Sequence, residues 1–415
     1  KIEEVVINSQ KAIWRKSPSE VSDEEYNQFY KHISHDFDDP LEKIHYRAEG
    51  TLEFFSILFI PKHAPFDLFM PDRRHGIHLY VKNVFITDDC KELLPEYLRF
   101  VRGVVDSSDL SLNVSREMLQ DDAIIRRIRK NLVSKILNTL KEMKEKRADD
   151  YLTFWNNFGK VLKEGMHTDF ENRERIQELL LFPNANSNGE KKISLREYVE
   201  AMPENQKEIY YLAGNSLDWV LDSPYLEGCR QRGFDVLFFT DPVDEFVAQS
   251  LTEYDGRKLR PLDRGDVDFG DGEEVKKENE EKRKQQEETY KELMDAIAKQ
   301  LETHVKEVRI SERLTDSPCC LVADAMGMSA HMEQLLKAMG QQYQPSRRIL
   351  EINPNHPIIQ KLNEFDKTSG EFADYCYLLL NQALMAEGSP VVEPGRFNRL
   401  LASVMTKVLT TEKES

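Results

Sequence analysis

The chain has 415 residues, enough for two or three domains with sizeable cores. Its 57 Lys and Arg against 74 Asp and Glu give a net charge of −17, which argues against nucleic acid as the main partner, because phosphate backbones bind concentrated positive charge. No apolar run approaches the ~18 residues of a membrane-spanning helix, so no membrane span is expected.

Residues 1–150 predict one α/β unit. Ser22 followed by Glu25 forms a capping box, which begins a helix with an apolar stripe on one face. Runs rich in β-branched and aromatic residues then predict an antiparallel sheet. The expected elements are two strands within 44–60, a strand at 77–86, a helix over 93–105, an extended piece at 110–114 and a long helix after Asp122.

Residues 151–262 predict a helical segment followed by a second, smaller α/β subdomain. Strands at 208–213 and 234–240 flank a helix that is expected to end at Gly233. Because consecutive strands joined by a helix pair in parallel with a right-handed crossover, this order predicts a βαβ unit.

The sequence from 263 to 288 is almost wholly charged and polar, which predicts a hinge that runs into a helix. An apolar stripe at helical spacing over 290–301 then begins a C-terminal α+β domain, residues 289–415. Strands of this domain are expected at 305–310, 318–322 and 348–353.

The C-terminal end predicts two helices, at about 371–387 and 395–409, joined by a turn rich in Gly and Pro. Their apolar faces exceed what the rest of the domain is expected to cover. A second copy is the economical partner, which gives a bundle of two helices from each subunit. The apolar residues of the two helices are Phe372, Cys376, Leu379, Leu380 and Ala383 in the first and Phe397, Leu400, Leu401, Val404, Met405 and Val408 in the second.

Several kinds of chemistry are not indicated. The sequence has neither a glycine-rich phosphate loop nor a G-x-S-x-G nucleophile elbow. The histidines lack Cys or further ligands at zinc spacing, so no metal is expected. Neighbouring Cys319 and Cys320 are explained by the two faces of a partly buried strand. A hydrolytic enzyme stays an alternative only through its many carboxylates, which a solvated surface already explains.

The cysteines and the first residue bear on location and completeness. The five cysteines are odd in number and scattered, which fits reduced thiols in the cytosol, so we expect a cytoplasmic protein. The first residue is Lys1 and no secretory leader follows, so we expect a processed chain or a piece of a longer one.

The sharpest local motif is LSLNVSREMLQ, residues 110–120. Ser115 suits a helix N-cap, and Arg116 and Gln120 then lie one helical turn apart on the same face. A planar guanidinium that never deprotonates suits a phosphate, but it equally suits a structural salt bridge, so the motif alone leaves both interpretations open.

Five longer stretches, the second of which contains this motif, are, in chain order, SDEEYNQFYKHISHDFDDPL (22–41), LPEYLRFVRGVVDSSDLSLNVSREMLQ (94–120), VLFFTDPVDEF (236–246), MSAHMEQLLKAMG (328–340) and LEINPNHPII (350–359). With them, the chain from end to end resembles the middle and C-terminal domains of the 90-kDa heat-shock protein chaperones, in particular the bacterial form. The resemblance implies a ribosomal-protein-S5-domain-2-like α/β unit, a helical linker with a small βαβ subdomain, and an α+β dimerisation domain with a terminal helix bundle. It also implies that the family's N-terminal ATPase domain and the acidic tail of its eukaryotic cytosolic members are missing here.

The resemblance gives the 110–120 motif a role. In the family, the Arg of this loop turns toward the γ-phosphate of ATP held by the N-terminal domain, which implies that role for Arg116, with Gln120 as its companion and Asn113 as a loop-shaping neighbour. ATP and Mg²⁺ are thus implied for the full-length protein, which is an ATPase in the family. No cofactor and no ATPase activity are expected of this chain alone.

The resemblance also implies a client-binding surface for partially folded proteins between the middle and C-terminal domains. Bacterial relatives often carry Trp where this chain has Phe246, so the indole N–H is lost at that position. The Phe66–Met70 loop is a second apolar candidate, with packing on the sheet as the alternative. The implied client-binding residues are Glu245, Phe246 and Gln249, then Met328, Met332, Leu335 and Leu336, the last four of which lie at i, +4, +7 and +8.

Partners follow from the same resemblance. A homodimer through the C-terminal helices, partially folded clients and co-chaperones of the 70-kDa heat-shock system are implied. A purely structural dimerisation scaffold without client binding is the alternative. The implied dimerisation residues are Phe372, Leu379, Leu380, Phe397, Leu400, Leu401 and Val404.

Overall fold

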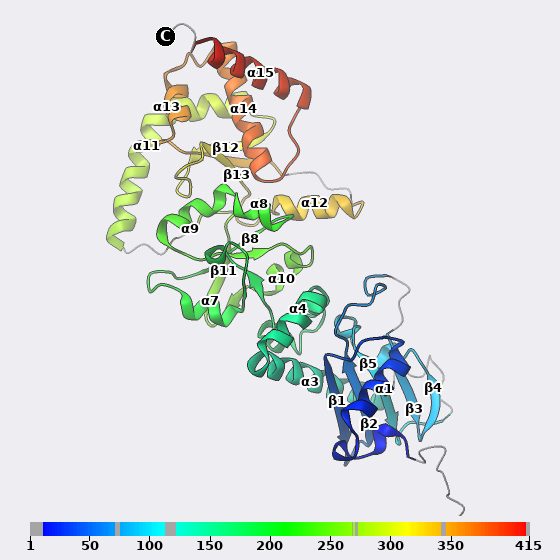
Figure 1. The fold of residues 1–415 in the computed structure, drawn as a ribbon. Helices are drawn as coiled ribbons and strands as arrows, with labels where there is room; N and C mark the ends of the chain where they lie inside the picture. The colour runs from blue at the N-terminus through cyan, green and yellow to red at the C-terminus, as the bar shows by residue number, and fades with distance from the viewer. Residues whose placement is uncertain are drawn as a thin grey trace, which may run out of the picture. The chain divides into compact units, whose positions relative to one another are not determined.

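The computed structural model describes residues 11–70, 75–112, 122–267, 269, 273–341 and 346–411. The chain groups into two compact units, 1–181 and 182–415, each with helices and sheets (Figure 1). The architecture is mixed α/β, as the sequence predicts.

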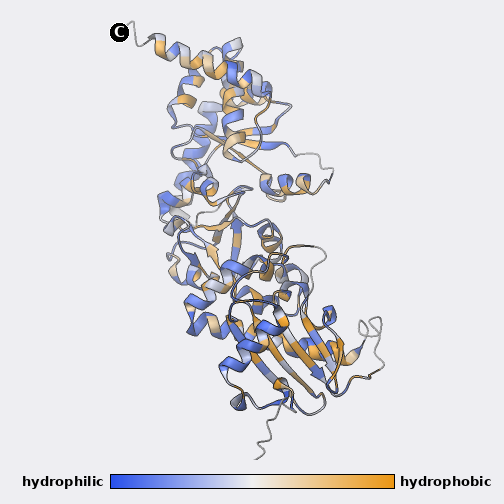
Figure 2. Cartoon of the chain, turned by 45° about the vertical axis from the view of Figure 1, so that its right-hand side comes forward, coloured by the Kyte–Doolittle hydropathy of each residue, from blue (hydrophilic) through white to orange (hydrophobic). Residues whose placement is uncertain are grey.

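The first unit is built on a five-stranded sheet with the strand order β1-β2-β5-β3-β4. β3 and β5 pair in parallel, and the other neighbours pair antiparallel. Figure 2 shows many residues of this sheet as hydrophobic, and β2, inside the sheet, is buried along its whole length, as expected of a strand covered on both faces. The strands are β1 (Glu42–Ala48), β2 (Phe54–Ile60), β3 (Ile77–Val81), β4 (Val84–Thr87) and β5 (Arg102–Ser107).

Helix α1 covers one face of this sheet. Its capping box is formed as predicted, because Ser22 Oγ accepts from Glu25 N and the Glu25 carboxylate accepts from Ser22 N. Tyr26 and Tyr30 of α1 share a core with Phe55, Ile57 and Phe59 of β2. The helices of this unit are α1 (Asp23–Ser34), α3 (Ala123–Lys146), α4 (Ala148–Lys163), α5 (Gly165–Thr168) and α6 (Arg173–Gln177).

Three predictions in this unit are wrong. The sheet expected to be antiparallel contains one parallel pair, β3 with β5, because the segment 88–101 crosses from the β4 side of β3 to its other side. The single strand expected at 77–86 is a hairpin, because Lys82 and Asn83 take positive φ angles of 51° and 65° that suit a tight turn. The helix expected over 93–105 is two short 3-10 turns and then β5, which pairs with β2 and β3 on its two edges. Sheet pairing and burial outweigh local propensity there.

The described residues of the second unit form three sheets. The strand β8 pairs in parallel with both β9 and β11, so the predicted parallel pairing of the first two is confirmed. The C-terminal sheet has the order β12-β14-β13. The strands are β6 (Phe182–Pro183), β7 (Lys192–Ile193), β8 (Ile209–Ala213), β9 (Leu237–Phe239), β10 (Glu253–Tyr254), β11 (Arg257–Pro261), β12 (Val305–Ile310), β13 (Cys319–Val322) and β14 (Arg348–Ile352).

The helices of the second unit surround these sheets (Figure 1). The predicted helix terminator Gly233 is the C-cap of α9, with φ of 70°. The helices are α7 (Leu195–Ala201), α8 (Leu217–Leu221), α9 (Glu227–Arg232), α10 (Asp244–Ser250), α11 (Glu273–Gln300), α12 (Ala330–Ala338), α13 (Pro357–Glu364), α14 (Gly370–Ala386) and α15 (Pro394–Thr411).

The C-terminal sheet is buried on both faces along β13 and β14. Cys319 lies in a core with residues of α11 and α14, and Cys320 lies in another core with Tyr210 and Leu226. The two cysteines therefore do take opposite faces, but the strand is fully rather than partly buried, because helices and strands of the same unit cover each side.

Candidate functional site

The three residues expected near a nucleotide lie outside the described residues. Asn113, Arg116 and Gln120 fall in the segment 113–121. Asp122 follows this segment, and its Oδ1 caps α3 by accepting from Ile124 N at 2.6 Å. The role of Arg116 therefore stays a prediction.

The helices α10 and α12 position the residues expected to bind clients. The Asp244 side chain stabilises the turn that leads into α10, because its Oδ2 accepts from Asp241 N at 2.9 Å. Ser329 is the N-cap of α12, where its Oγ accepts from Met332 N at 2.9 Å. Glu245 of α10 reaches the beginning of α12, which joins segments more than 80 residues apart in the chain.

Glu245 is a buried charge, with its side chain only 3% exposed. Its Oε1 accepts the Ser329 hydroxyl at 2.7 Å and lies 3.0 Å from Nδ1 of His331. Burial alone would raise the pKa of Glu245, but the hydrogen bonds from His331 and Ser329 and the charge of Arg264 outweigh it, so the pKa lies below its usual value. A fixed negative charge therefore sits beside the first turn of α12.

A second polar cluster holds the middle of α12. Arg348 Nη2 lies 3.0 Å from Glu333 Oε1, and Arg348 Nε lies 3.6 Å from Glu387 Oε2 at the end of α14. Gln334 donates from Nε2 to the carbonyl oxygen of Gly388 at 2.7 Å and accepts from Asn215 Nδ2 at 2.9 Å. Burial raises the pKa of Glu387 to about 7, although Arg348 and Ser389 oppose the shift.

Methionine side chains are exposed at the two ends of α12. Met326 and Met328, in the loop before the helix, are 98% and 38% exposed, and Met339 at its C-cap is exposed as well. Met332 is buried, and Leu335 and Leu336 are half-buried. Because Met328 precedes the N-cap Ser329, the four predicted residues do not form one continuous helical stripe.

The other α10 residues differ in exposure. Gln249 is exposed, whereas Phe246 is half-buried. In the first unit, the Phe66–Met70 loop exposes Phe66, Phe69 and Met70 while Leu68 is buried. The loop therefore packs on its unit through Leu68 and presents three large apolar side chains at the surface.

The two C-terminal helices treat their apolar residues differently. Phe372, Leu379 and Leu380 of α14 are buried in the core of the same chain, against β13 and α11. On α15, Phe397, Leu400 and Val404 are half-buried and Leu401 is exposed. The expectation that the domain cannot cover its terminal helices thus applies to α15 and not to α14.

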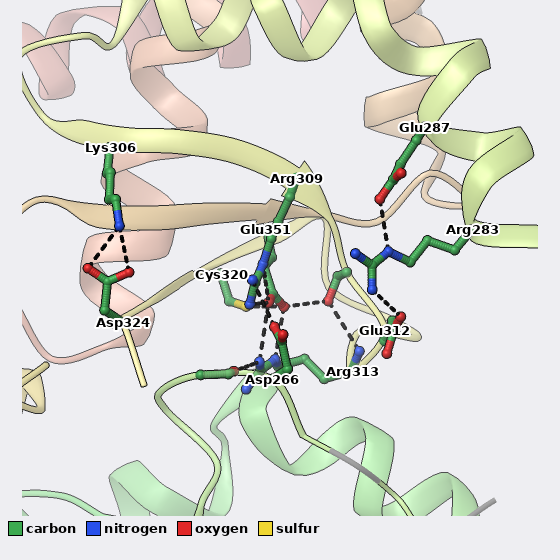
Figure 3. Close-up of polar contacts among 12 residues, drawn as sticks. Asp266, Arg283, Glu287, Lys306, Arg309, Glu312, Arg313, Cys320, Asp324 and Glu351 are labelled. Atoms are coloured by element: carbon green, nitrogen blue, oxygen red, sulfur yellow. Dashed lines mark hydrogen bonds and ion pairs between the residues drawn. The ribbon is translucent and has the colours of Figure 1, made fainter. Parts of the chain in front are cut away.

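A buried ion network, which sequence reasoning missed, anchors the segment before α11. Figure 3 shows the Glu351 carboxylate between Arg309 and Arg313. Arg309 Nη2 and Arg313 Nε approach the carboxylate at 2.7 and 2.8 Å. Arg313 also donates to the carbonyl oxygens of Leu262 and Gly265. The start of the segment expected as a hinge is therefore tied to β14.

Sequence reasoning also missed the residues that hold α12. A Ser directly before a helical stripe is an N-cap signal and could have identified Ser329. His331, Arg348 and Glu387 carry no local signal, because their partners lie far away in the sequence.

Within the described ranges, no three His, Cys, Asp or Glu side chains are arranged to hold a metal ion. None of the helices in the described part of the chain has the length and apolar character needed to cross a membrane.

Comparison with protein families and known sequences gives consistent matches. Residues 1–415 match the family model described as "Hsp90 protein". A "Chaperone protein HtpG" of Geobacter sulfurreducens is 57% identical over 408 residues, covering 98% of this chain and 63% of the relative. The protein of the same name in Geobacter metallireducens is 56% identical over 405 residues, covering 97% and 62%. That of Bdellovibrio bacteriovorus is 47% identical over 413 residues, covering 99% and 65%.

The fold has a solved counterpart. The middle domain of a Plasmodium falciparum heat shock protein superposes with a TM-score of 0.55 and 38% sequence identity, covering 61% of this chain and 100% of that one. The chain spans 62 to 65% of the length of the three relatives named above.

Proposed function

The chain belongs to the Hsp90 family, and on that premise we propose that it supplies the client-binding and dimerisation portion of an ATP-dependent molecular chaperone of the HtpG type. In this proposal, residues 1–150, with a ribosomal-protein-S5-domain-2-like topology, and 151–262 make up the middle domain. Residues 263–288 are a hinge that runs into α11, and residues 289–415 form the dimerisation domain. The protein works in the cytoplasm, as a homodimer, on partially folded proteins and with co-chaperones of the 70-kDa heat-shock system.

The observation that carries the client-binding part is the exposure of Met326 and Met328 beside α12. Large apolar side chains left in solvent on a chain of net charge −17 indicate an interaction surface. Flexible, polarizable thioethers suit a surface that must accept many different apolar segments. Half-buried Phe246 and exposed Gln249 of the neighbouring α10 complete the proposed surface.

The remaining predicted residues take different places in this surface. Leu335 and Leu336, half-buried on α12, border it, and Met332 supports it from below. The exposed side chains of the Phe66–Met70 loop are a second apolar contact for clients in the first unit.

Arg116 is proposed to contact the γ-phosphate of ATP, with Gln120 and Asn113 shaping its loop. A guanidinium supplied from outside the nucleotide pocket stabilises the charge that develops in phosphoryl transfer only when the domains close. Residues 1–415 contain no glycine-rich phosphate loop, so we expect this chain alone to hydrolyse no ATP. In the full-length protein, Arg116→Ala should lower ATP turnover about 10²- to 10³-fold and leave nucleotide affinity unchanged. A wild-type rate with Arg116→Ala would contradict this assignment.

Dimerisation is proposed to use α15. Leu401, Met405 and Leu409 are exposed on this helix, and a second copy of it is the occupant that the family relationship supports. The α14 residues Phe372, Leu379 and Leu380 then act from within the protomer by holding the helix pair in place.

The test of the proposed function is binding of a permanently unfolded protein. Reduced, carboxymethylated α-lactalbumin carrying a fluorophore is titrated with the chain, and its anisotropy is recorded. Saturable binding supports the chaperone proposal. A stable dimer that does not bind the unfolded probe would favour a purely structural dimerisation scaffold.

A further inference from the structure

The helix α12 is attached to its unit mainly by polar contacts. Of its nine residues, only His331 and Met332 are buried. Lys337 and Ala338 at the far end are exposed, as is the C-cap Met339. A short helix with so little apolar anchorage depends on specific hydrogen bonds and ion pairs to keep its place.

The first of these attachments is Glu245. One carboxylate oxygen, Oε1, both accepts the Ser329 hydroxyl at 2.7 Å and meets His331 Nδ1 at 3.0 Å. Ser329 uses the same hydroxyl oxygen to cap α12 by accepting from Met332 N. Glu245 therefore fixes the residue that begins the helix and a residue in its first turn.

Arg264 reinforces this attachment from the loop side. Its Nη1 lies 3.4 Å from the carbonyl oxygen of Gly327, directly before Met328, and its positive charge helps to lower the pKa of Glu245. The Ala323 amide donates to the carbonyl oxygen of Asp263 at 3.1 Å, which pins the base of the same loop. The exposed Met326 and Met328 are thus displayed by a loop that is fixed at both ends.

From this geometry we infer that Glu245 is a positioning residue, which sets client affinity by holding α12 and the methionine loop in place and not by touching the client. The inference rests on the proposed client-binding function. Its basis is that the Glu245 carboxylate is buried and already engaged by two partners, so a client chain has no access to it. Exposed Gln249, one helical turn further along α10, has no such shielding and is open to direct contact with a client.

Replacing Glu245 leaves the Ser329 hydroxyl and the His331 ring without their carboxylate partner. Glu245→Ala removes the acceptor of two buried donors and lets α12 move away from α10. We expect affinity for reduced, carboxymethylated α-lactalbumin to fall about tenfold. Amide hydrogen exchange across 329–339 should rise at least tenfold, while exchange in β8 stays unchanged. Glu245→Gln keeps the shape of the side chain and one acceptor oxygen, so its affinity and its exchange rates should lie between those of the wild type and Glu245→Ala. It replaces the alanine variant in this test if that variant folds poorly.

Gln249→Ala is the matched control on the same helix. It should weaken binding of the unfolded probe without changing hydrogen exchange across 329–339. If Glu245→Ala leaves that exchange unchanged while weakening binding, Glu245 acts as a direct contact and the inference is wrong.

A rescue experiment separates positioning from contact. Asn215 is exposed and its side chain hydrogen-bonds Gln334 of α12, so Asn215→Cys with Gln334→Cys can be joined by a short bismaleimide. All five native cysteines are buried and should not compete. The cross-link ties α12 to its unit independently of Glu245. It should restore binding to Glu245→Ala up to the level of the cross-linked parent, and should not restore it to Gln249→Ala.

Two results would overturn the inference: no rescue of Glu245→Ala by the cross-link, or equal rescue of both variants. Absence of binding by the wild-type chain would instead reject the proposed function, and the hydrogen-exchange result would still report whether Glu245 holds α12.

Discussion

The two C-terminal helices have similar sequence patterns and opposite environments. α14 turns Phe372, Leu379 and Leu380 into the core of its own chain. α15 leaves Leu401 and Met405 exposed to solvent. An apolar stripe at helical spacing therefore shows that a helix needs a partner, but it does not show whether the partner is the same chain or another one.

The same distinction recurs around α12 on a smaller scale. Met332 is buried and holds the helix, whereas Met328, four residues earlier, is exposed. Four residues is one helical turn, and the spacing therefore predicts a common face. The N-cap at Ser329 separates the two side chains instead.

The largest expected effect is on α14. Leu380→Ala creates a cavity in a core that the chain itself closes, so the free energy of unfolding should fall by about 2–5 kcal/mol. Urea denaturation measures this change. Light scattering under native conditions should still give the wild-type oligomeric state, and a dissociated but fully stable protein would place Leu380 at the subunit interface instead.

The fold was predictable where the structure of a segment depends on the residues of that segment alone. The α3 helix has its cap at Asp122 and its apolar stripe within one stretch, and its position was predicted correctly. β5 was mistaken for a helix because its strand character comes from pairing with β2 and β3, which lie elsewhere in the sequence.

The site was less predictable from the residues. Glu245 and Ser329 form a hydrogen bond although they lie more than 80 residues apart in the sequence, and no local sequence pattern predicts such a pair. Only the family resemblance indicated Glu245, and the burial of its carboxylate is the observation behind the positioning role that we propose for it.

The second-largest expected effect is on how stability depends on pH, and it comes from Glu387, which is buried at the end of α14. The fold raises the pKa of its carboxyl from 4.5 to about 7, so the folded state binds the proton more tightly than the unfolded chain. The contribution of Glu387 to stability is therefore fully present below pH 4.5 and is lost as the pH rises through about 7.

Glu387→Gln should remove this dependence. Relative to wild type, the variant should gain about 2–3 kcal/mol between pH 5 and pH 8 in urea unfolding experiments. If the free energy of unfolding changes with pH in the same way for both proteins, Glu387 is ionised throughout this range and burial does not dominate its pKa.

Substitutions on α15 should change the stability of the fold less than those above, but they should abolish the dimer. Leu401→Glu with Met405→Glu places two charges on an exposed face, so folding should cost less than about 1 kcal/mol. Because like charges would face each other across a symmetric interface, the scattering mass at micromolar concentration should fall from twice the 48.4 kDa of the chain to that value. A dimer that survives both changes would exclude α15 as its interface.

The most direct test of the central claim compares Met328→Ser with the wild-type chain in binding reduced, carboxymethylated α-lactalbumin by fluorescence anisotropy. Met328 is exposed, so the substitution should leave the unfolding midpoint and the dimer unchanged. We expect saturable binding by the wild type and about fivefold to tenfold weaker binding by Met328→Ser. Equal affinity of the two proteins, or no binding by the wild type, would contradict it.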